Sequence, residues 1–509
     1  MMRHWLATLA VLGGLAAAST AAQEYGPRVN LIAAEGGGRV VAVSSESRRG
    51  VRELLNDGDA QPASTFSFAD RAPHPQAVTF AFAKNGGGRL RRIVINQPAS
   101  RAAWFRDRFI GTFELQASRV SSTSGFEKVG TFTCDPDGSL SQSFDLGGQD
   151  ARFVRLVVRS NRLGSGGIIG DVEVWGNALS PKERIIGEEE ASALIGTTRE
   201  RGRGVVAVAM TPLEKNLLAD ARDFRLNRHL LIDALLIASG ANTEPELNRF
   251  RDKFHKLTET LRRSGRLSLG GPRDKARAIL ETMHTDVLSA YTSKLADIRQ
   301  AFETGEYNCV TASALFLCLA ERFGLRVSAE DRGGHVLTRL RGGGESFYIE
   351  TTLGRWFRMS PIEKQIALRQ FAEHEDGPRR EMTRLGLVAM MYFNRGALML
   401  EKKLYREAIS ESFKAACIDP GSPEALDNLI CAYTKLAFHL TKQKRYDEAL
   451  RVVDRAKEFD PYRLSLQVTR SVIDNERTCQ PEPSPKKPSS ETSPPSGSEK
   501  GTTSSSTAP

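Results

Sequence analysis

Three side chains could together perform nucleophilic chemistry: the thiol of Cys309, the imidazole of His335 and the carboxyl group of Glu350. Cys309 stands where a loop meets a long apolar run, which predicts the start of a buried helix. Asn308, directly before it, is a good N-cap residue and would place Cys309 in the first turn. There the helix dipole favours the thiolate, which is the nucleophilic form of cysteine. The position therefore predicts a nucleophile.

His335 and Glu350 fall on two predicted strands that a glycine-rich turn joins. A four-residue loop would pair Glu345 with Leu340. In that register Glu350 lies directly opposite His335, and opposed β-carbons are about 5 Å apart. The carboxylate could then hold one ring nitrogen and fix the tautomer of the imidazole. Nucleophile, base and orienting acid would follow in chain order, with Asp331 as the rival for the acid.

Residues 211–359 resemble the transglutaminase-like superfamily. The matching stretches are residues 307–315, 319–325, 334–336 and 349–352. The resemblance implies an α+β, papain-like domain in which Cys309 is the nucleophile, His335 the general base and Glu350 the orienting acid, where relatives more often carry aspartate. It also implies action on peptide or protein amides by hydrolysis or acyl transfer. The sequence looks closest to the bacterial branch with a tetratricopeptide tail after the acid, and some members of that branch could be inactive.

Residues 28–176 predict an all-β domain, because short alternating runs are separated by Gly, Asn, Asp and Ser turns. Several of its segments resemble discoidin (galactose-binding-like) domains. They are, in chain order, residues 54–58, 65–67, 113–118, 126–130, 151–156 and 171–176. The resemblance implies a jelly-roll sandwich that binds a glycan, a peptide or another surface through loops at one end.

The same resemblance implies a structural calcium ion near the Asp57-Gly58 turn. Asp57 and Glu173 would be its oxygen ligands, which are the hard donors that calcium prefers. Asp57-Gly58 is also favourable turn chemistry without a metal, and we favour this simpler interpretation. The six cysteines show no CxxC motif and no spacing typical of zinc, so no further cofactor is required. A Cys417–Cys431 disulfide is conceivable.

Residues 389–477 fit the tetratricopeptide pattern. In the first copy Gly396 takes the small position of one helix, and Ala408 and Ala415 take the close-contact positions of the next. A second copy with a longer spacing follows, and a last helix is expected over residues 463–477. Two repeats are fewer than a free-standing solenoid needs, so we expect them to pack on the thiol domain. They could buttress that domain or bind a protein partner.

The first residues and the composition predict an exported protein. Residues 1–22 combine a basic start, an apolar run and a small-x-small site, as in a signal peptide, with an uncleaved anchor as the alternative. No later stretch is apolar for long enough to span a membrane. The net charge of +10 is scattered, so nucleic-acid binding is not predicted. Residues 480–509, rich in Pro, Ser and Thr, predict a disordered tail.

The sequence therefore predicts a multidomain, extracytoplasmic protein. Its expected parts are a signal peptide (1–22), a jelly-roll β-sandwich (28–176), a linker (177–210), a transglutaminase-like α+β domain (211–388), tetratricopeptide repeats (389–477) and a disordered tail (480–509). Two functions stay open. One is a periplasmic or secreted thiol enzyme that acts on amides and is brought to a glycan or surface by the β domain. The other is a catalytically inactive scaffold that binds glycan and protein partners.

Overall fold

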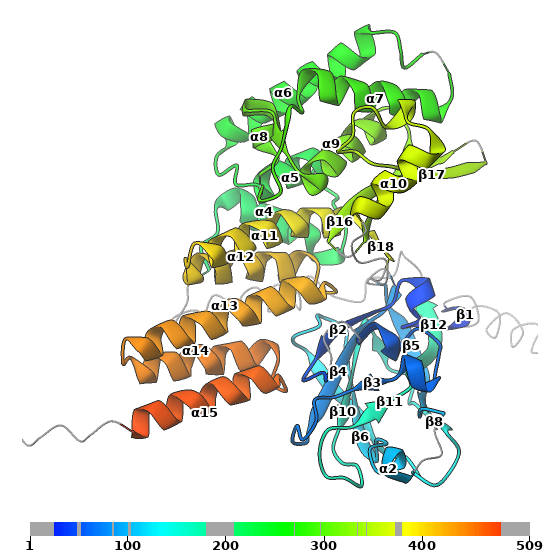
Figure 1. Cartoon of the computed structure of the whole chain (residues 1–509), viewed down its shortest axis with the longest axis vertical. Helices are drawn as coiled ribbons and strands as arrows, with labels where there is room; N and C mark the ends of the chain where they lie inside the picture. Colours follow the sequence, from blue (N-terminus) through cyan, green and yellow to red (C-terminus); the bar gives the residue numbers. More distant parts are fainter. Residues whose placement is uncertain are drawn as a thin grey trace, which may run out of the picture.

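The computed structural model describes residues 25–479, apart from residues 48–51, 84–85, 100–102, 180–207, 269, 296, 333, 343 and 372–378. The predicted signal peptide, most of the predicted linker and the predicted tail lie outside the described residues. A β-sandwich, an α+β domain and a set of helical hairpins follow one another along the chain (Figure 1). Among the helices described, none is both long and apolar enough to cross a membrane.

Two five-stranded antiparallel sheets form the sandwich. The first contains β1 (Tyr25–Asn30), β12 (Asp171–Leu179), β5 (Gly88–Asn96) and β8 (Ser141–Asp145) in that order, with β9 (Asp150–Ala151) also paired to β5. The second has the order β2 (Arg39–Val43), β4 (Gln76–Ala81), β10 (Phe153–Val158), β6 (Thr112–Ser118) and β7 (Phe126–Thr133). Inward-facing side chains of both sheets share one apolar core, which includes Ile93, Phe113 and Val174. The predicted β-sandwich is confirmed.

The α+β domain is built around one buried helix and one antiparallel sheet. Its helices are α4 (Pro212–Asp220), α5 (Leu231–Ala238), α6 (Glu244–Arg263), α7 (Pro272–Asp286), α8 (Arg299–Glu303), α9 (Cys309–Arg322) and α10 (Pro361–Phe371). Its sheet has the order β17 (Glu345–Ile349), β16 (His335–Gly342), β15 (Arg326–Arg332) and β18 (Arg379–Met382). The apolar helix α9 packs against β15 and β16, which explains why nearly all of its faces are buried.

Local capping signals fix where several of these helices begin. The side chain of Thr211 accepts a hydrogen bond from the backbone N–H of Glu214, and that of Thr243 accepts one from Glu246. Each bond satisfies one of the unpaired N–H groups at a helix start. A short parallel pair, β13 (Ala290–Tyr291) with β14 (Glu306–Tyr307), leads directly into α9.

The C-terminal part consists of two helical hairpins and a fifth helix. The helices are α11 (Arg384–Glu401), α12 (Tyr405–Ile418), α13 (Pro423–Lys442), α14 (Tyr446–Phe459) and α15 (Leu464–Thr478). Gly396 must be small, because a Cβ there would lie 2.7 Å from the hydroxyl oxygen of Ser412. The predicted boundary at residues 388 and 389 falls within α11. That helix packs on α5 and α9, so the expected packing on the α+β domain is present.

The hairpins also cover one face of the sandwich, a contact that the sequence does not predict (Figure 1). Ala42 and Phe153, on the second sheet, share an apolar cluster with Leu429 of α13. The backbone N–H of Leu464 donates to the carbonyl oxygen of Ser44 at 2.8 Å. The three parts of the chain are therefore held together by direct packing.

A buried charge cluster joins the hairpins to the α+β domain. The Lys414 ammonium lies 2.8 Å from a Glu214 carboxylate oxygen and 2.9 Å from one of Glu411. The side chains of Lys414 and Glu214 are 4% and 3% exposed. Arg395 of α11 pairs with the second oxygen of Glu411 at 3.2 Å. Removing one partner from such a cluster leaves the others charged and desolvated.

We expect Lys414→Ala to lower the free energy of unfolding by about 3 to 5 kcal/mol, because Glu214 and Glu411 would stay buried without their cation. Urea unfolding of the full chain measures the loss. Lys402→Ala removes an exposed lysine at the end of α11 and serves as the control. Equal effects of the two substitutions would contradict the prediction.

Candidate active site

Cys309 is the first residue of α9, as the sequence predicts. Its neighbour Asn308 is the N-cap. The Asn308 side-chain oxygen accepts a hydrogen bond from the backbone N–H of Thr311 at 2.9 Å. In return the Thr311 hydroxyl accepts one from the backbone N–H of Asn308, also at 2.9 Å. The Asn308 amide also donates to the Leu295 carbonyl oxygen at 2.9 Å. Cys309 is 7% exposed. The thiol is therefore held at the positive end of a helix whose start is fixed on two sides.

The structure brings Cys309, His335 and Glu350 together. The His335 Nε2 atom lies 2.6 Å from Glu350 Oε2, and His335 also hydrogen-bonds to Cys309. Because Glu350 occupies Nε2, Nδ1 is the ring nitrogen left to face the sulfur. The other Glu350 oxygen accepts from the Thr352 backbone N–H at 3.0 Å and from the Thr352 hydroxyl at 2.6 Å. A fully buried carboxylate thus fixes the imidazole beside the thiol.

The predicted register of the two strands is wrong by two residues. Gly342 pairs with Glu345, and Leu340 pairs with Phe347, so the turn has two residues instead of four. Gly344 in that turn has a φ of 81°, which tight hairpins favour. Glu350 follows the end of β17 and is a diagonal neighbour of His335. A shift of two residues keeps each side chain on its face, and a diagonal gap is within reach of a glutamate.

Charge dominates the state of the imidazole. Burial lowers the pKa of His335, but hydrogen bonds with Cys309 and Glu350, and the negative charges of both, raise it to about 10. The imidazole therefore stays protonated at neutral pH. It then carries the positive charge between two groups that can be anionic, the sulfur and the carboxylate.

Two residues that the sequence does not single out hold the segment after Glu350. Tyr307 donates its hydroxyl to the carbonyl oxygen of Thr352 at 3.1 Å. His284 Nε2 lies 2.9 Å from the carbonyl oxygen of Thr351, and burial lowers the pKa of His284, so a neutral ring donates there. The rings of His284 and Tyr307 meet edge to face at 5.4 Å. His284 ends an amphipathic helix, and no local pattern in the sequence distinguishes it from a surface residue.

The alternatives that the sequence leaves open can now be placed. Asp331, the rival acid, lies on β15, and its Oδ1 accepts from the backbone N–H of Gly334 at 3.0 Å. Cys318, on the same helix as Cys309, is buried, and this burial raises its pKa well above the ordinary value. All six cysteines are free, so the conceivable Cys417–Cys431 disulfide is not formed.

The two predicted calcium ligands take part in hydrogen bonds of the sandwich. Asp57 Oδ1 accepts a hydrogen bond from the backbone N–H of Asp59 at 2.9 Å. This bond is typical of an aspartate in a turn and needs no metal ion. Glu173, on β12, accepts from the Asn96 amide at 2.8 Å and from the Trp175 indole N–H. In the described part of the chain, no group of three His, Cys, Asp or Glu residues is arranged to hold a metal ion. The calcium site stays a prediction.

Asp171 is a third carboxyl group near Asp57 and Glu173. The sequence does not single it out as a functional residue. It is 1% exposed, and its Oδ1 accepts from the backbone N–H of Gly58 at 3.2 Å. Burial, together with the negative charges of Glu173 and Asp57, outweighs its hydrogen bonds and raises the pKa of Asp171 to about 7. This carboxyl group is therefore partly protonated at neutral pH.

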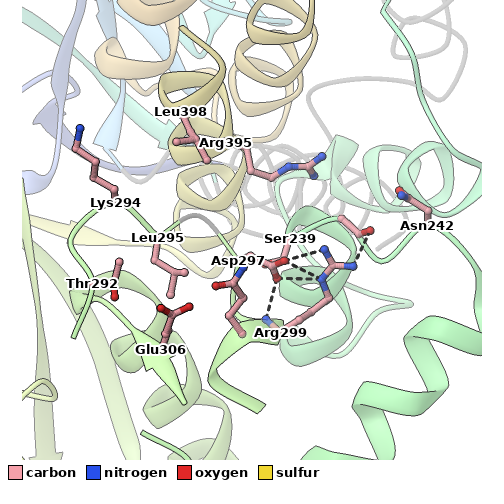
Figure 2. Close-up of a pocket in the computed structure, with 12 residues that line it drawn as sticks. Ser239, Asn242, Thr292, Lys294, Leu295, Asp297, Arg299, Glu306, Arg395 and Leu398 are labelled. Atoms are coloured by element: carbon pink, nitrogen blue, oxygen red, sulfur yellow. Dashed lines mark hydrogen bonds and ion pairs between the residues drawn. The ribbon is translucent and has the colours of Figure 1, made fainter. Parts of the chain in front are cut away.

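A pocket of about 390 Å³ lies between the end of α5, the segment before α9, and α11 (Figure 2). Cys309 is not among its lining residues. Three cations line it, and each has a carboxylate partner: Arg299 pairs with Asp297, Lys294 with Glu401 and Arg395 with Glu411. Because these charges are already paired, the pocket is a polar junction between the α+β domain and α11.

No protein-family model and no curated protein sequence matches the chain. Solved structures that resemble part of it include the module CpGH89CBM32-5 from Clostridium perfringens in complex with GalNAc-β-1,3-galactose (17% identity, 28% of this chain, 96% of that chain, TM-score 0.24). A second is the family 32 module of C. perfringens NanJ in complex with galactose (14% identity, 29% of this chain, 99% of that chain, TM-score 0.24). A third is a chitosan-binding module from Paenibacillus sp. IK-5 (18% identity, 29% of this chain, 99% of that chain, TM-score 0.24). Such low scores do not decide what this chain binds.

The raised pKa of Asp171 predicts a pH-dependent stability. The folded state binds this proton more tightly than the unfolded chain, so its contribution to stability is largest at low pH and falls as the pH rises from about 4 through about 7. Asp171→Asn should therefore become more stable relative to the wild type, by about 2 to 3 kcal/mol, as the pH rises from 5 to 8. Thermal unfolding at both pH values measures this. Asp145→Asn, at a side chain that is 86% exposed, is the control. If the difference in unfolding free energy between Asp171→Asn and the wild type is the same at both pH values, the prediction is contradicted.

Proposed function

We propose that the chain is an extracytoplasmic thiol enzyme of the transglutaminase-like kind, which acts on peptide or protein amides. The observation that supports this is the chain of contacts from Cys309 through His335 to the buried Glu350. A nucleophilic cysteine needs a base within hydrogen-bond reach and a third group that orients the base. The pKa of His335 is raised by its hydrogen bonds with Cys309 and Glu350, so the imidazole is protonated beside the thiol and can act as the acid of the reaction.

In the proposed reaction the sulfur of Cys309 attacks the amide carbonyl carbon, and the new C–S bond leaves an oxyanion on the carbonyl oxygen. The backbone N–H of Cys309, unpaired at the helix start, is a candidate donor to that oxyanion. His335 gives its proton to the leaving nitrogen as the C–N bond breaks, which releases an amine and leaves an acyl thioester.

The second half of the reaction regenerates the thiolate. Water or a second amine attacks the thioester carbonyl while neutral His335 takes a proton from it. The C–S bond breaks, and the thiolate and the imidazolium form again. Water gives hydrolysis and an amine gives acyl transfer, and Glu350 keeps the ring oriented through both halves.

The second candidate is a catalytically inactive scaffold. It is supported by the low exposure of the site, since Cys309 and His335 are 7% and 9% exposed. An enzyme of the proposed kind must therefore give its substrate access to two residues that are almost fully buried.

For the helical hairpins we propose tetratricopeptide repeats that serve mainly as an internal support. The crowded approach at Gly396 is the close crossing that such repeats need. One side of the hairpins packs on the α+β domain through α11, and another packs on the sandwich through α13. A protein partner would be limited to the faces that these contacts leave open.

For the sandwich we propose binding of a glycan or another surface ligand. The helical hairpins cover part of the second sheet at Ala42, Ala81 and Phe153. A ligand would be limited to the faces of the sandwich that these contacts leave open. Calcium held by Asp57 and Glu173 would support such a site from the Asp57-Gly58 turn.

Alkylation of Cys309 tests the thiol chemistry. In the wild type we expect the iodoacetamide labelling rate to change by less than about threefold between pH 6 and pH 8.5, because the proposal requires protonated His335 to keep the sulfur nucleophilic over this range. In His335→Ala the rate should rise roughly 150-fold over the same range, as for an unperturbed thiol with a pKa of about 8.5. Mass spectrometry of the Cys309 peptide measures both rates.

The exposed thiol of Cys479 is an internal reference in the same samples. A wild-type profile as steep as that of His335→Ala would reject activation by His335 and favour the scaffold.

Glycan binding can be tested separately with the full chain carrying Cys309→Ala. On an array that presents galactosides, N-acetylgalactosaminides and chitosan oligomers, we expect this variant to bind the same glycans as the wild type, because the sandwich has its own core. Repeating the assay with calcium chloride and with a chelator tests the calcium prediction, which requires weaker binding in the chelator. The absence of any glycan bound by either protein would contradict the proposed role of the sandwich.

A further inference from the structure

Tyr291 lies beside the candidate site. It belongs to the two-residue strand β13, which pairs in parallel with β14, so that Tyr291 is the register partner of Tyr307. Two residues after Tyr307 the chain reaches Cys309. The rings of Tyr291 and Tyr307 meet edge to face with their centroids 5.8 Å apart. This pairing fixes the position of the Tyr291 ring relative to the nucleophile.

The two rings differ in what they do for the fold. Tyr307 is 7% exposed, and its hydroxyl holds the segment after Glu350. Tyr291 is 50% exposed. The site nevertheless affects its hydroxyl. Burial raises the pKa of Tyr291, and nearby negative charge at Cys309 and Glu350 raises it further. The Tyr291 hydroxyl is therefore within electrostatic reach of the thiol and the acid, while half of the residue is exposed to solvent.

We propose that Tyr291 forms the wall against which the acyl group of the substrate packs, so that the site prefers acyl donors with an uncharged, apolar side chain. The inference rests on the proposed thiol chemistry of Cys309. A carbonyl carbon must come to about 3 to 3.5 Å from the sulfur before attack, which brings the group attached to it onto the neighbouring surface. There the exposed ring offers apolar contact, which favours an apolar group over a charged one.

Two alkylating probes of different size separate this wall from the reactivity of the thiol. Chloroacetamide and N-benzylchloroacetamide react in the same way: a C–S bond forms at Cys309, the C–Cl bond breaks and chloride leaves. In the wild type we expect the benzyl probe to label Cys309 faster than the plain probe by about three- to tenfold, the range that one aromatic contact supplies. Tyr291→Ala should bring the ratio of the two rates close to one.

Matched variants identify the cause. Tyr291→Phe keeps the ring and should keep the ratio, whereas a ratio lost in Tyr291→Phe would assign the effect to the hydroxyl and overturn the proposal. Leu230→Ala removes an exposed apolar side chain elsewhere in the same domain (61% exposed) and controls for general surface effects. An unchanged ratio in Tyr291→Ala, or a wild-type preference for an aminoethyl-substituted probe, would also overturn it. If neither probe labels wild-type Cys309, the proposed thiol chemistry itself fails.

Discussion

The hydrogen bond between His335 and Glu350 constrains the whole centre. A carboxylate with no exposed surface is expensive to bury unless every oxygen has a partner. Glu350 meets this condition with His335 on one oxygen and the backbone and hydroxyl of Thr352 on the other. Rotation of the imidazole would leave a buried charge without its cation. The ring is therefore held with Nδ1 toward Cys309, and the surrounding residues Tyr307 and His284 hold the chain that carries the acid.

Local chemistry explains which parts of this arrangement the sequence predicts. Asn308 caps α9, and Thr211 caps α4, because each needs only a side-chain oxygen and a backbone N–H three residues on. The register between β16 and β17 depends instead on how many glycines enter the turn. Gly342 belongs to the strand, not to the loop, and this moves the pairing by two residues. The contact of Glu350 with His335 is still predicted correctly because side-chain direction repeats every two residues.

Contacts between distant parts of the chain have no comparable local signal. β10 is buried on both faces, which is typical of a strand that is covered by a second layer. In the middle of that strand Arg155 stacks on Phe126 at 3.8 Å, with Tyr462 of the helical part 5.8 Å away. From the neighbouring residues of its strand alone, an arginine within an apolar run is predicted to face solvent. Tyr462, one of the residues around it, lies some three hundred positions later, where the sequence pattern predicts only a turn between helices.

The two cysteines of α9 provide a comparison within one helix. Cys318 packs in the apolar core, and its burial raises its pKa, so it stays a neutral thiol that fills space. Cys309 has instead an imidazolium at its side and a carboxylate behind that ring. For stability alone such a buried charged group gains little, since apolar residues of similar size often serve as well or better. A chain that needed α9 only as a core helix could place a second small apolar residue at position 309, and this contrast with Cys318 is why we propose a chemical role for Cys309.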